Sequence, residues 1–543
     1  MAHLVKPPCD EGVIAARPAV APCTPSAAGW VLAATILGSS MSFIDGTVVN
    51  VALPSIQRDF GAPADTVQWV IEAYSLFLAA LILVGGALGD RLGRRRIFAA
   101  GIALFTLASV ICGIAPNMLV LIVARALQGV GGALLVPGSL AIISASFDER
   151  RRGAAIGTWA GFTTITSALG PVLGGWLVQA ASWRWVFLIN VPLAAITLAV
   201  TFLHVPESRD ETARGRLDVL GAGLATVGLG ALVFGLIESS ALGLGAPLVV
   251  LALLIGAVGL VVFVWHEARA ESAGVTPMVP LRLFRSRTFS GTNLLTLLLY
   301  AALGGALYFF PFNLQQVQGY SPAAAGAALL PMTLIIFALS RWTGGLIARY
   351  GARLPLVLGA SIAAAGFALF AVPGIGGSYW TTYFPATVVL SLGMAIVIAP
   401  LTTAVMNSVP TDHAGTASGI NNAVSRAAGL LAIAVLNLVV VSVFATSLDA
   451  QLAALGATPA LRDTLGAQAA HLAGTQPPAG LDAATAAAVS HAIDAAFVSG
   501  FRVAMLIGAA LALGSALAAA LLVEGKPAST GAPAAKGADA RTS

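Results

Sequence analysis

Three charged residues lie within long apolar stretches of the chain, where a charge is costly and is usually retained for a function. Asp45 and Glu72 can bind and release a proton, and Arg125 would stabilise the charged form of a nearby carboxylate. Asp45 lies about 16 residues, or roughly 24 Å, from the start of its stretch. We expect Asp45 to carry a proton, Arg125 to modulate it and Glu72 to be a second proton site. A static ion pair is the alternative for Asp45, and contact with interfacial water is the alternative for Glu72.

The segment 86–95 joins two apolar stretches and concentrates charge within a few residues. Its glycines permit a tight turn and close helix approach, and its acid can pair with an arginine or lie at a positive helix N-terminus. We expect the segment to hold the cytoplasmic face closed in one state and release it in another; a purely topological role for its positive charge is the alternative. The candidate gate residues are Gly86, Asp90, Arg91, Gly93, Arg94 and Arg95.

The segment 344–353 repeats this pattern in register, with matching Gly, Leu, Arg, Gly and Arg, although Ala348 replaces the acid at Asp90. The same position at a helix end predicts a duplication that produced two related helical bundles. Parallel repeats of this kind place a substrate site near the membrane midplane, between the halves.

Glycines crowd the stretch 157–175 around a single proline. A proline inside a spanning helix removes a backbone hydrogen bond and bends the axis, so we expect a bend that shapes how the central cavity opens. Ordinary close packing is the alternative. The candidate bend residues are Gly170, Pro171, Gly174 and Gly175.

Polar residues also occur within the apolar stretches of the second half. The candidates for contact with substrate are Arg341, Asn421, Asn422 and Arg426, for which structural roles are the alternative. No acidic residue falls in the midsection of any predicted helix between 289 and 523, so a dedicated cation site is not expected there.

The composition indicates which elements must position these residues. The chain has 543 residues, 58% of them apolar and only 9% charged, against roughly 25% charged in a soluble domain. Apolar runs of 18 or more residues are long enough to span a bilayer, and they are continuous rather than alternating, which excludes a β-barrel. The sequence therefore predicts an all-α integral membrane protein and excludes a soluble enzyme, a DNA-binding protein and a secreted disulfide scaffold.

Fourteen membrane helices are predicted. Their ranges are 29–54, 66–89, 96–115, 117–145, 153–180, 185–204, 215–238, 246–266, 289–313, 322–348, 353–372, 379–405, 413–445 and 495–523. We expect two pseudo-symmetric six-helix bundles with two helices inserted between them. The predicted parts are an N-terminal tail (1–28), a first bundle (29–204), the inserted pair (215–266), a second bundle (289–523) with an extracytoplasmic loop (446–494), and a C-terminal tail (524–543).

The basic residues predict the orientation. Of the 28 Lys and Arg residues, 21 fall in the tails and even-numbered loops and three in the odd-numbered loops. Positive charge accumulates on the cytoplasmic side, so we expect both tails in the cytoplasm and the protein in a bacterial inner membrane. The loop 446–494 would then lie outside, as a structural cap or a substrate-binding lid.

No cofactor is expected. The chain has no nucleotide-binding P-loop, no cluster of metal ligands and no Ser/His/Asp arrangement, and Cys9, Cys23 and Cys112 lack metal spacing. We predict a transporter and not an enzyme. Its expected partners are a small-molecule substrate, protons and the lipid bilayer, without nucleic acid; a periplasmic adaptor protein is a further candidate partner.

Several segments resemble the major facilitator superfamily, and specifically its fourteen-helix drug:proton antiporter branch. The resemblance covers about residues 40–523 and rests on the segments 42–54, 86–96, 125–129, 170–175, 183–192 and 415–422. It implies that Arg125 belongs to the motif tied to proton coupling and that 170–175 is the antiporter motif, which exporters carry and sugar symporters generally lack.

The resemblance and the residues together predict a proton-coupled exporter of small organic molecules or drugs. A metabolite exporter of narrow specificity and a proton-coupled importer are the first alternatives, and the antiporter motif weighs against import. A non-transporting membrane sensor is the second, although the short tail 524–543 offers no signalling domain.

Overall fold

The apolar stretches form helices because a helix satisfies its backbone hydrogen bonds internally, as a bilayer requires. The computed structural model describes residues 25–525 except 148, 210–217, 273–276, 278, 345 and 410–413. Most of the two predicted tails therefore lies outside the described residues, as do some side chains within helices, that of Arg341 among them. Helices and no strands occur within the described ranges.

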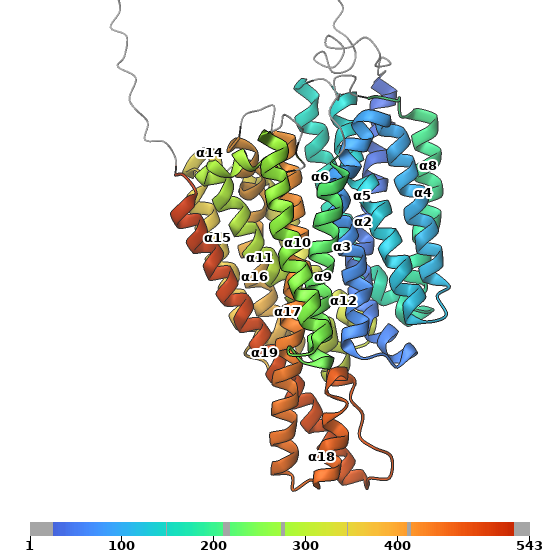
Figure 1. Cartoon of the computed structure of the whole chain (residues 1–543), viewed down its shortest axis with the longest axis vertical. Coiled ribbons are helices and arrows are strands. Elements are labelled where there is room, and N and C mark those ends of the chain that lie inside the picture. Colours follow the sequence, from blue (N-terminus) through green and yellow to red (C-terminus); the bar gives the residue numbers. More distant parts are fainter. Residues whose placement is uncertain are drawn as a thin grey trace, which may run out of the picture.

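Two groups of helices stand side by side (Figure 1). The first contains α2 (Pro25–Phe60), α3 (Ala64–Leu92), α4 (Arg94–Gly113), α5 (Met118–Ser146), α6 (Glu149–Ala180), α7 (Trp185–Leu188) and α8 (Asn190–His204). The second contains η1 (Leu281–Arg285), α11 (Arg287–Phe312), η2 (Asn313–Val317), α12 (Pro322–Ala327), α13 (Leu330–Gly344), α14 (Leu346–Tyr350), α15 (Arg353–Phe370), α16 (Tyr379–Asn407), α17 (Ala414–Ala454), α18 (Pro459–Gly466), η4 (Ala469–Gly474) and α19 (Ala483–Leu522).

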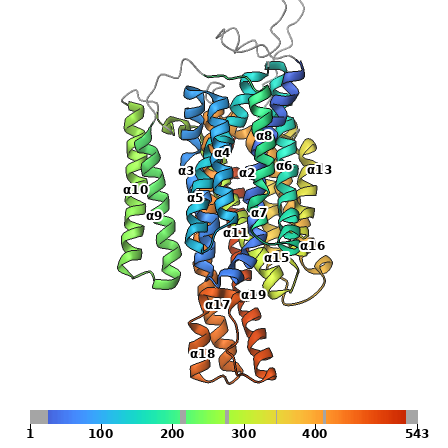
Figure 2. The same cartoon turned by 90° about the vertical axis from the view of Figure 1, so that its right-hand side faces the viewer.

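In the chain, α9 (Val219–Leu242) and α10 (Pro247–Ser272) come between the two groups. In space they form a hairpin at the side of the molecule (Figure 2). The hairpin touches both groups, because α9 packs on α3 and on α17. Helix α9 makes most of the contacts with the bundles, whereas α10 touches η1 and exposes large apolar side chains along its outer face.

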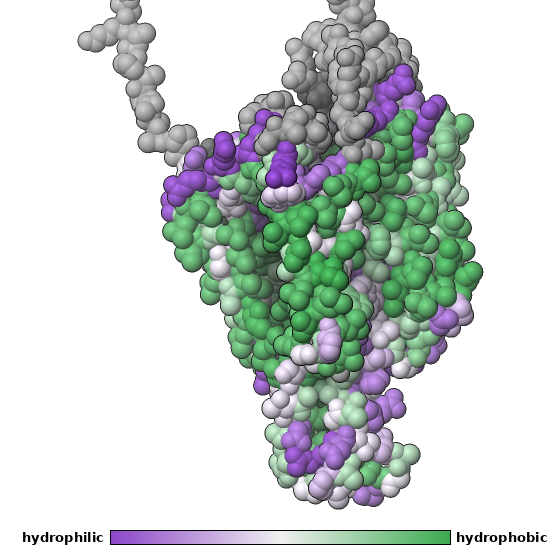
Figure 3. All heavy atoms as spheres, viewed as in Figure 1, coloured by the Kyte–Doolittle hydropathy of each residue, from purple (hydrophilic) through white to green (hydrophobic). Residues whose placement is uncertain are grey.

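The face seen in Figure 3 is a wide apolar belt bounded by hydrophilic residues at both ends. Within the described residues, thirteen helices are long and apolar enough to cross a membrane. The fourteenth expected helix, 153–180, is α6, a helix of 32 residues whose described apolar part is limited to Leu169–Ala180. An all-helical multi-spanning architecture is therefore confirmed.

Prolines interrupt two helices that were expected to be continuous. The range 185–204 divides into α7 and α8 at Ile189, because Pro192 lacks the N–H that would bond to the Leu188 carbonyl. The range 322–348 divides at Ala328 and Leu329, since Pro331 lacks the N–H that would bond to the Ala327 carbonyl. The first break places Asn190 at the start of α8, facing the interior.

The helices on either side of the predicted loop 446–494 extend into it. Helix α17 continues to Ala454 and α19 already begins at Ala483, because these alanine-rich flanks favour helix. Together with α18 and η4 they project beyond the bundle, at the end opposite the described chain ends (Figure 1).

The two groups meet at that same projecting end. Near it, the Gln315 amide donates to the Val51 carbonyl (2.9 Å) and the Gln316 amide donates to Gln57 (2.9 Å). Gln57 in turn donates to the backbone carbonyl of His471 in η4 (3.4 Å). Through η4, the projecting part of the second group therefore contacts the first group near the place where the two groups meet.

Candidate functional site

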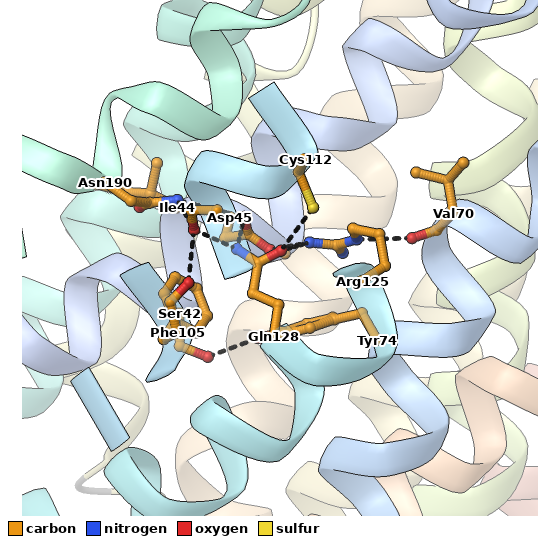
Figure 4. A network of polar contacts seen from close by, with 12 residues as sticks. Ser42, Ile44, Asp45, Val70, Tyr74, Phe105, Cys112, Arg125, Gln128 and Asn190 are labelled. Carbon is orange, nitrogen blue, oxygen red and sulfur yellow. Dashed lines mark hydrogen bonds and ion pairs between the residues drawn. The ribbon is translucent and has the colours of Figure 1, made fainter. Parts of the chain in front are cut away.

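The first bundle carries a buried polar network in its interior (Figure 4). Asp45 lies near the middle of α2, which packs on α5 and α8, while α5 also packs on α3 and α4. Because these helices converge, side chains distant in sequence reach one another. The network members are Ser42, Asp45, Tyr74, Ser109, Cys112, Arg125, Gln128 and Asn190, and the backbone carbonyl of Val70 also takes part.

The predicted charges Asp45 and Arg125 form an ion pair. Arg125 Nη1 lies 2.6 Å from Asp45 Oδ2, and the two side chains are 1% and 0% exposed. Arg125 Nε also donates to the Val70 carbonyl (2.7 Å), and its guanidinium lies 4.3 Å from the centre of the Tyr74 ring. The cation is thus held by a carboxylate, a carbonyl and an aromatic face, which together offset its removal from water.

Gln128 completes the enclosure of this pair. Its amide nitrogen donates to Asp45 Oδ1 (2.7 Å) and to Ser109 Oγ (2.9 Å), while its oxygen accepts from Arg125 Nη1 (2.6 Å). Asn190 adds a longer contact of 3.5 Å to Asp45 Oδ1 and a hydrogen bond of 3.2 Å to Ser109 Oγ. Both oxygens of Asp45 therefore face hydrogen-bond donors.

A proton arriving at Asp45 would change this balance. It would neutralise the carboxylate and leave the Arg125 charge facing only dipoles and an aromatic ring. A buried charge without a counter-charge is expensive, so the protonated network favours a conformation that gives Arg125 other surroundings. Since Asp45 is fully buried here, proton exchange requires the bundles to rearrange.

The structure does not join Glu72 to this network. Glu72 accepts a hydrogen bond from Gln68 (3.3 Å), and its second oxygen has no partner among the described residues. It lies on the side of α3 toward the second bundle, within electrostatic reach of Tyr308 in α11. The side chain is fully buried, so the alternative of simple contact with interfacial water is wrong for this conformation.

The charged segment 86–95 is tied to its own bundle by a residue that the sequence did not single out. Glu207, in the segment after α8, accepts from the backbone N–H of Arg95 (3.0 Å) and lies 3.8 Å from its guanidinium. Gly93 has φ +115°, and a Cβ there would lie 2.7 Å from a Glu207 oxygen, so only glycine fits. Asp90 pairs with Arg94 at 2.8 Å.

The remaining gate candidates contribute less to these contacts. Arg91 has no ion pair within the described part of the chain, and a Cβ at Gly86 would make ordinary contact with Pro137 of α5. The ion pairs of this segment therefore stay within the first bundle and the segment that follows it, and a role in gating stays a prediction.

The glycines of α6 permit close approach of two different partners. Added side chains at Gly170 and Gly174 would collide with Thr47 and Val48 of α2, and one at Gly175 would collide with the Pro322 carbonyl of α12. In return, a side chain at Gly326 of α12 would collide with the carbonyl of Pro171. These glycines serve close packing within and between the bundles, and α6 runs through Pro171 as one helix; the bend stays a prediction.

The candidates of the second bundle differ from one another. Asn421 donates to Asn293 (3.2 Å) and Thr296 (2.7 Å) of α11, so it joins two helices. Asn422 is exposed. Arg426 has a buried Nε with no hydrogen-bond partner among the described residues, and the side chain of Arg341 lies outside them.

Sequence reasoning missed the uncharged members of the network. Gln128 lies one helical turn after Arg125 and therefore on the same face of α5, which is a signal that could have been used. Asn190 is the first residue of α8, directly after the break caused by Pro192. Ser109 carries no comparable signal in the sequence.

Two helical bundles that meet at one end, one of them with a buried ion pair in its interior, are the architecture expected of a multi-pass membrane transporter. The family model described as Major Facilitator Superfamily matches residues 35–433. The chain belongs to this superfamily.

Relatives and solved structures agree with that assignment. The chain is 35% identical to the multidrug resistance protein Stp of Mycobacterium tuberculosis over 88% of this chain and 89% of the relative. It is 35% identical to the tetracenomycin C resistance and export protein of Streptomyces glaucescens, over 89% of each chain. The crystal structure of a bacterial homologue of the human lysosomal transporter Spinster, inward-facing and occupied, has a TM-score of 0.63 at 16% identity. That match covers 92% of this chain and 97% of the other, and it supports the fold alone.

Proposed function

We propose that this protein is a proton-coupled antiporter that exports small organic molecules across the inner membrane of a bacterium. The observation that carries the proposal is the fully buried Asp45–Arg125 pair, in which a single proton would change the charge of a sealed network. The exported molecule itself undergoes no chemical change. Two relatives are named for drug resistance and export, which favours outward movement of an organic compound.

The orientation of the protein follows from its charges. The described ends of α2 and α19 lie at one end of the molecule (Figure 1), where the even-numbered loops with most of the basic residues also lie. Positive loops favour the cytoplasm. The end at which the bundles meet then faces outward, so the conformation described here is closed to the outside.

In the proposed cycle, opening to the outside exposes Asp45 to water and allows it to take up a proton. The proton weakens the pairing with Arg125 and favours return to a state open to the cytoplasm. There Asp45 releases the proton and substrate binds in the cavity between the bundles. The ties between segment 86–95 and Glu207 keep the cytoplasmic ends of α3, α4 and α8 together as one unit during this movement.

The test is proton flux coupled to drug transport. Purified protein in liposomes with an imposed pH gradient should move protons when tetracenomycin C or puromycin, compounds in the names of two relatives, is added. Asp45→Asn keeps the shape of the side chain and removes its titration, and it should abolish this flux. Asp59→Asn is the matched control, because Asp59 lies on the same helix, is 46% exposed and pairs with Arg184 at the surface.

Drug-dependent proton flux that survives Asp45→Asn would place the coupling elsewhere, with Glu72 the next site to change. Substrate movement without any proton flux would refute antiport. If neither compound produces proton flux, the alternative of a metabolite exporter with a narrow substrate range is favoured. Proton-driven uptake of the compound would favour an importer.

A further inference from the structure

The two halves of the membrane domain carry different charges. In the sequence, the whole stretch 287–448 contains one acidic residue, Asp412, which lies between the predicted helices and outside the described residues. The same stretch places Arg341 and Arg426 within helices. The first bundle, in contrast, holds two intramembrane acids beside its one intramembrane arginine. The stretch 287–448 of the second bundle therefore presents positive charge without an acid inside its helices to balance it.

Arg426 is the described member of this pair, and it lies on α17, a helix that packs on α3 of the first bundle. On α17, Asn422 lies one turn before it and is exposed. Gly429 lies one turn after it, and a Cβ there would meet nothing within 4 Å. On α2 of the first bundle, Gly46 is exposed and likewise has open space beside it. The open positions at Asn422 and Gly429 leave room beside Arg426 on its own helix.

The guanidinium of Arg426 has no counter-charge among the described residues. Its Nε is buried and has no hydrogen-bond partner. The Asp45 carboxylate is already occupied by Arg125 and Gln128. Arg502 shows what a structural arginine looks like in the same bundle, since it donates to the backbone carbonyls of Val372 and Pro373.

The surroundings of Arg426 suit an acidic group on an aromatic body. A guanidinium binds a carboxylate through two parallel hydrogen bonds, and a cation in the membrane interior gains most from a partner of opposite charge. On α2, Phe43 lies one turn before Gly46 and packs edge-to-face with Trp159 of α6 at 6.4 Å between ring centres. These two rings offer an aromatic surface on the facing bundle.

We propose that Arg426 binds the acidic group, a carboxylate or phenolate, of an aromatic organic acid that this protein carries, a substrate class that rests on the proposed export function. The site also lies close to the proton network. Arg426 is within electrostatic reach of the Tyr74 hydroxyl, and that hydroxyl contacts Ser42 (2.7 Å), three residues before Asp45. The Tyr74 ring also lies against Arg125, so a charge change at Arg426 would act on a residue that contacts the proton network.

The experiment compares two dyes that share a xanthene ring system and differ in charge. Fluorescein is an anion with a carboxylate and a phenolate, and rhodamine 123 is a cation. Binding to the full-length protein in detergent is measured by fluorescence anisotropy at constant pH, and transport is measured in proteoliposomes with a pH gradient. The wild-type protein should bind fluorescein at least tenfold more tightly than rhodamine 123.

Arg426→Gln should weaken fluorescein binding at least tenfold, which is the range expected for a charge-assisted hydrogen bond, and should leave rhodamine 123 binding unchanged. Arg426→Lys should retain part of the affinity, because it keeps the charge without the paired donors. Arg502→Gln is the control for loss of one positive charge in the same bundle, and it should bind fluorescein like the wild type. A melting temperature for each variant identifies any loss of fold.

Unchanged fluorescein binding in Arg426→Gln, a preference for rhodamine 123, or no fluorescein binding by the wild-type protein would each overturn the proposal. If Arg426→Gln unfolds, the folded Arg426→Lys variant decides, since full wild-type affinity or none at all would contradict a paired-donor site. Fluorescein binding that depends on Arg426 but is not followed by gradient-driven transport would refute the antiport function and leave the acid site standing.

Discussion

The buried Asp45–Arg125 pair can be tested through its stability as well as its transport. At 2.6 Å the Coulomb attraction is about 6 kcal/mol for an effective dielectric constant of 20. Most of this offsets the loss of water around both groups, so the pair adds little net stability. Removal of one partner is different, because it leaves a buried charge unbalanced and costs about 3–5 kcal/mol.

Three variants separate these effects: Asp45→Asn, Arg125→Gln and the double variant. Each single change should lower the free energy of unfolding by about 3 kcal/mol or more, because the remaining partner keeps its charge. The double variant leaves neutral amides in the same space and should recover at least about 2 kcal/mol of that loss, as an interaction energy between contacting residues. Transport should fail in all three, since none retains a titrating carboxylate beside a cation.

The assay is equilibrium unfolding in detergent micelles, followed by the fluorescence of the nine tryptophans, with Asp59→Asn as the surface control. If the losses of the two single variants simply add in the double variant, to within about 0.5 kcal/mol, the two residues do not act as one electrostatic unit. In that case the argument that one proton at Asp45 reorganises the network would be refuted.

Three further outcomes are expected. Glu207→Ala should release Arg95 from the segment after α8 and slow transport several-fold, with faster trypsin cleavage at 91–96 as the independent readout; unchanged cleavage would contradict the tie. Gly175→Leu should place a side chain against the Pro322 carbonyl and hold the outer end open, as measured by cysteine labelling there, whereas Gly223→Leu, at a position with open space, should not. Hydrogen bonds from the Thr485 side chain and from backbone N–H groups lower the pKa of Asp482 below its usual value of about 3.8. Because the pKa of Asp482 is lower in the folded state, its cap of α19 is fully stabilising above the usual pKa of about 3.8. This stabilisation is lost as the pH falls through the lower folded-state pKa. Helix fraying in the wild-type protein at low pH should then match that of Asp482→Ala at neutral pH, as measured by circular dichroism.

The helices were predictable because a bilayer leaves the chain few choices. A run of about 20 apolar residues must satisfy its backbone within itself, so counting such runs located the long helices, with the largest departures at the end of α17 and the start of α19. Their interruptions were less visible, since Pro192 and Pro331 affect carbonyls four residues earlier. The extensions of α17 and α19 were not predicted, because their alanine-rich flanks contain no long apolar run.

The site was predictable only where charge revealed it. Asp45 and Arg125 stand out because a charge inside the membrane is rare and costly, and the structure does bring them together. Gln128, Ser109 and Asn190 are uncharged, and their importance depends on which helix faces which, a tertiary property. Glu207 lies outside the membrane, where an acid is ordinary and only its contacts distinguish it.

Tyr74 connects the buried ion pair of the first bundle with Arg426 of the second. Its ring lies against Arg125, its hydroxyl contacts Ser42 on the helix that carries Asp45, and the same hydroxyl is within electrostatic reach of Arg426 on the other bundle. Helix α3, which carries Tyr74, packs on α17 across the interface between the bundles. In the proposed cycle an anion at Arg426 would balance one positive charge, whereas a proton at Asp45 would remove the negative charge that balances Arg125. A proton alone would leave both arginines without a counter-charge, an anion alone would leave both balanced, and the two together would leave Arg125 unbalanced. The charges alone therefore do not oppose binding of both ligands, so exchange of a substrate for a proton requires Asp45 and Arg426 to be accessible in different conformations.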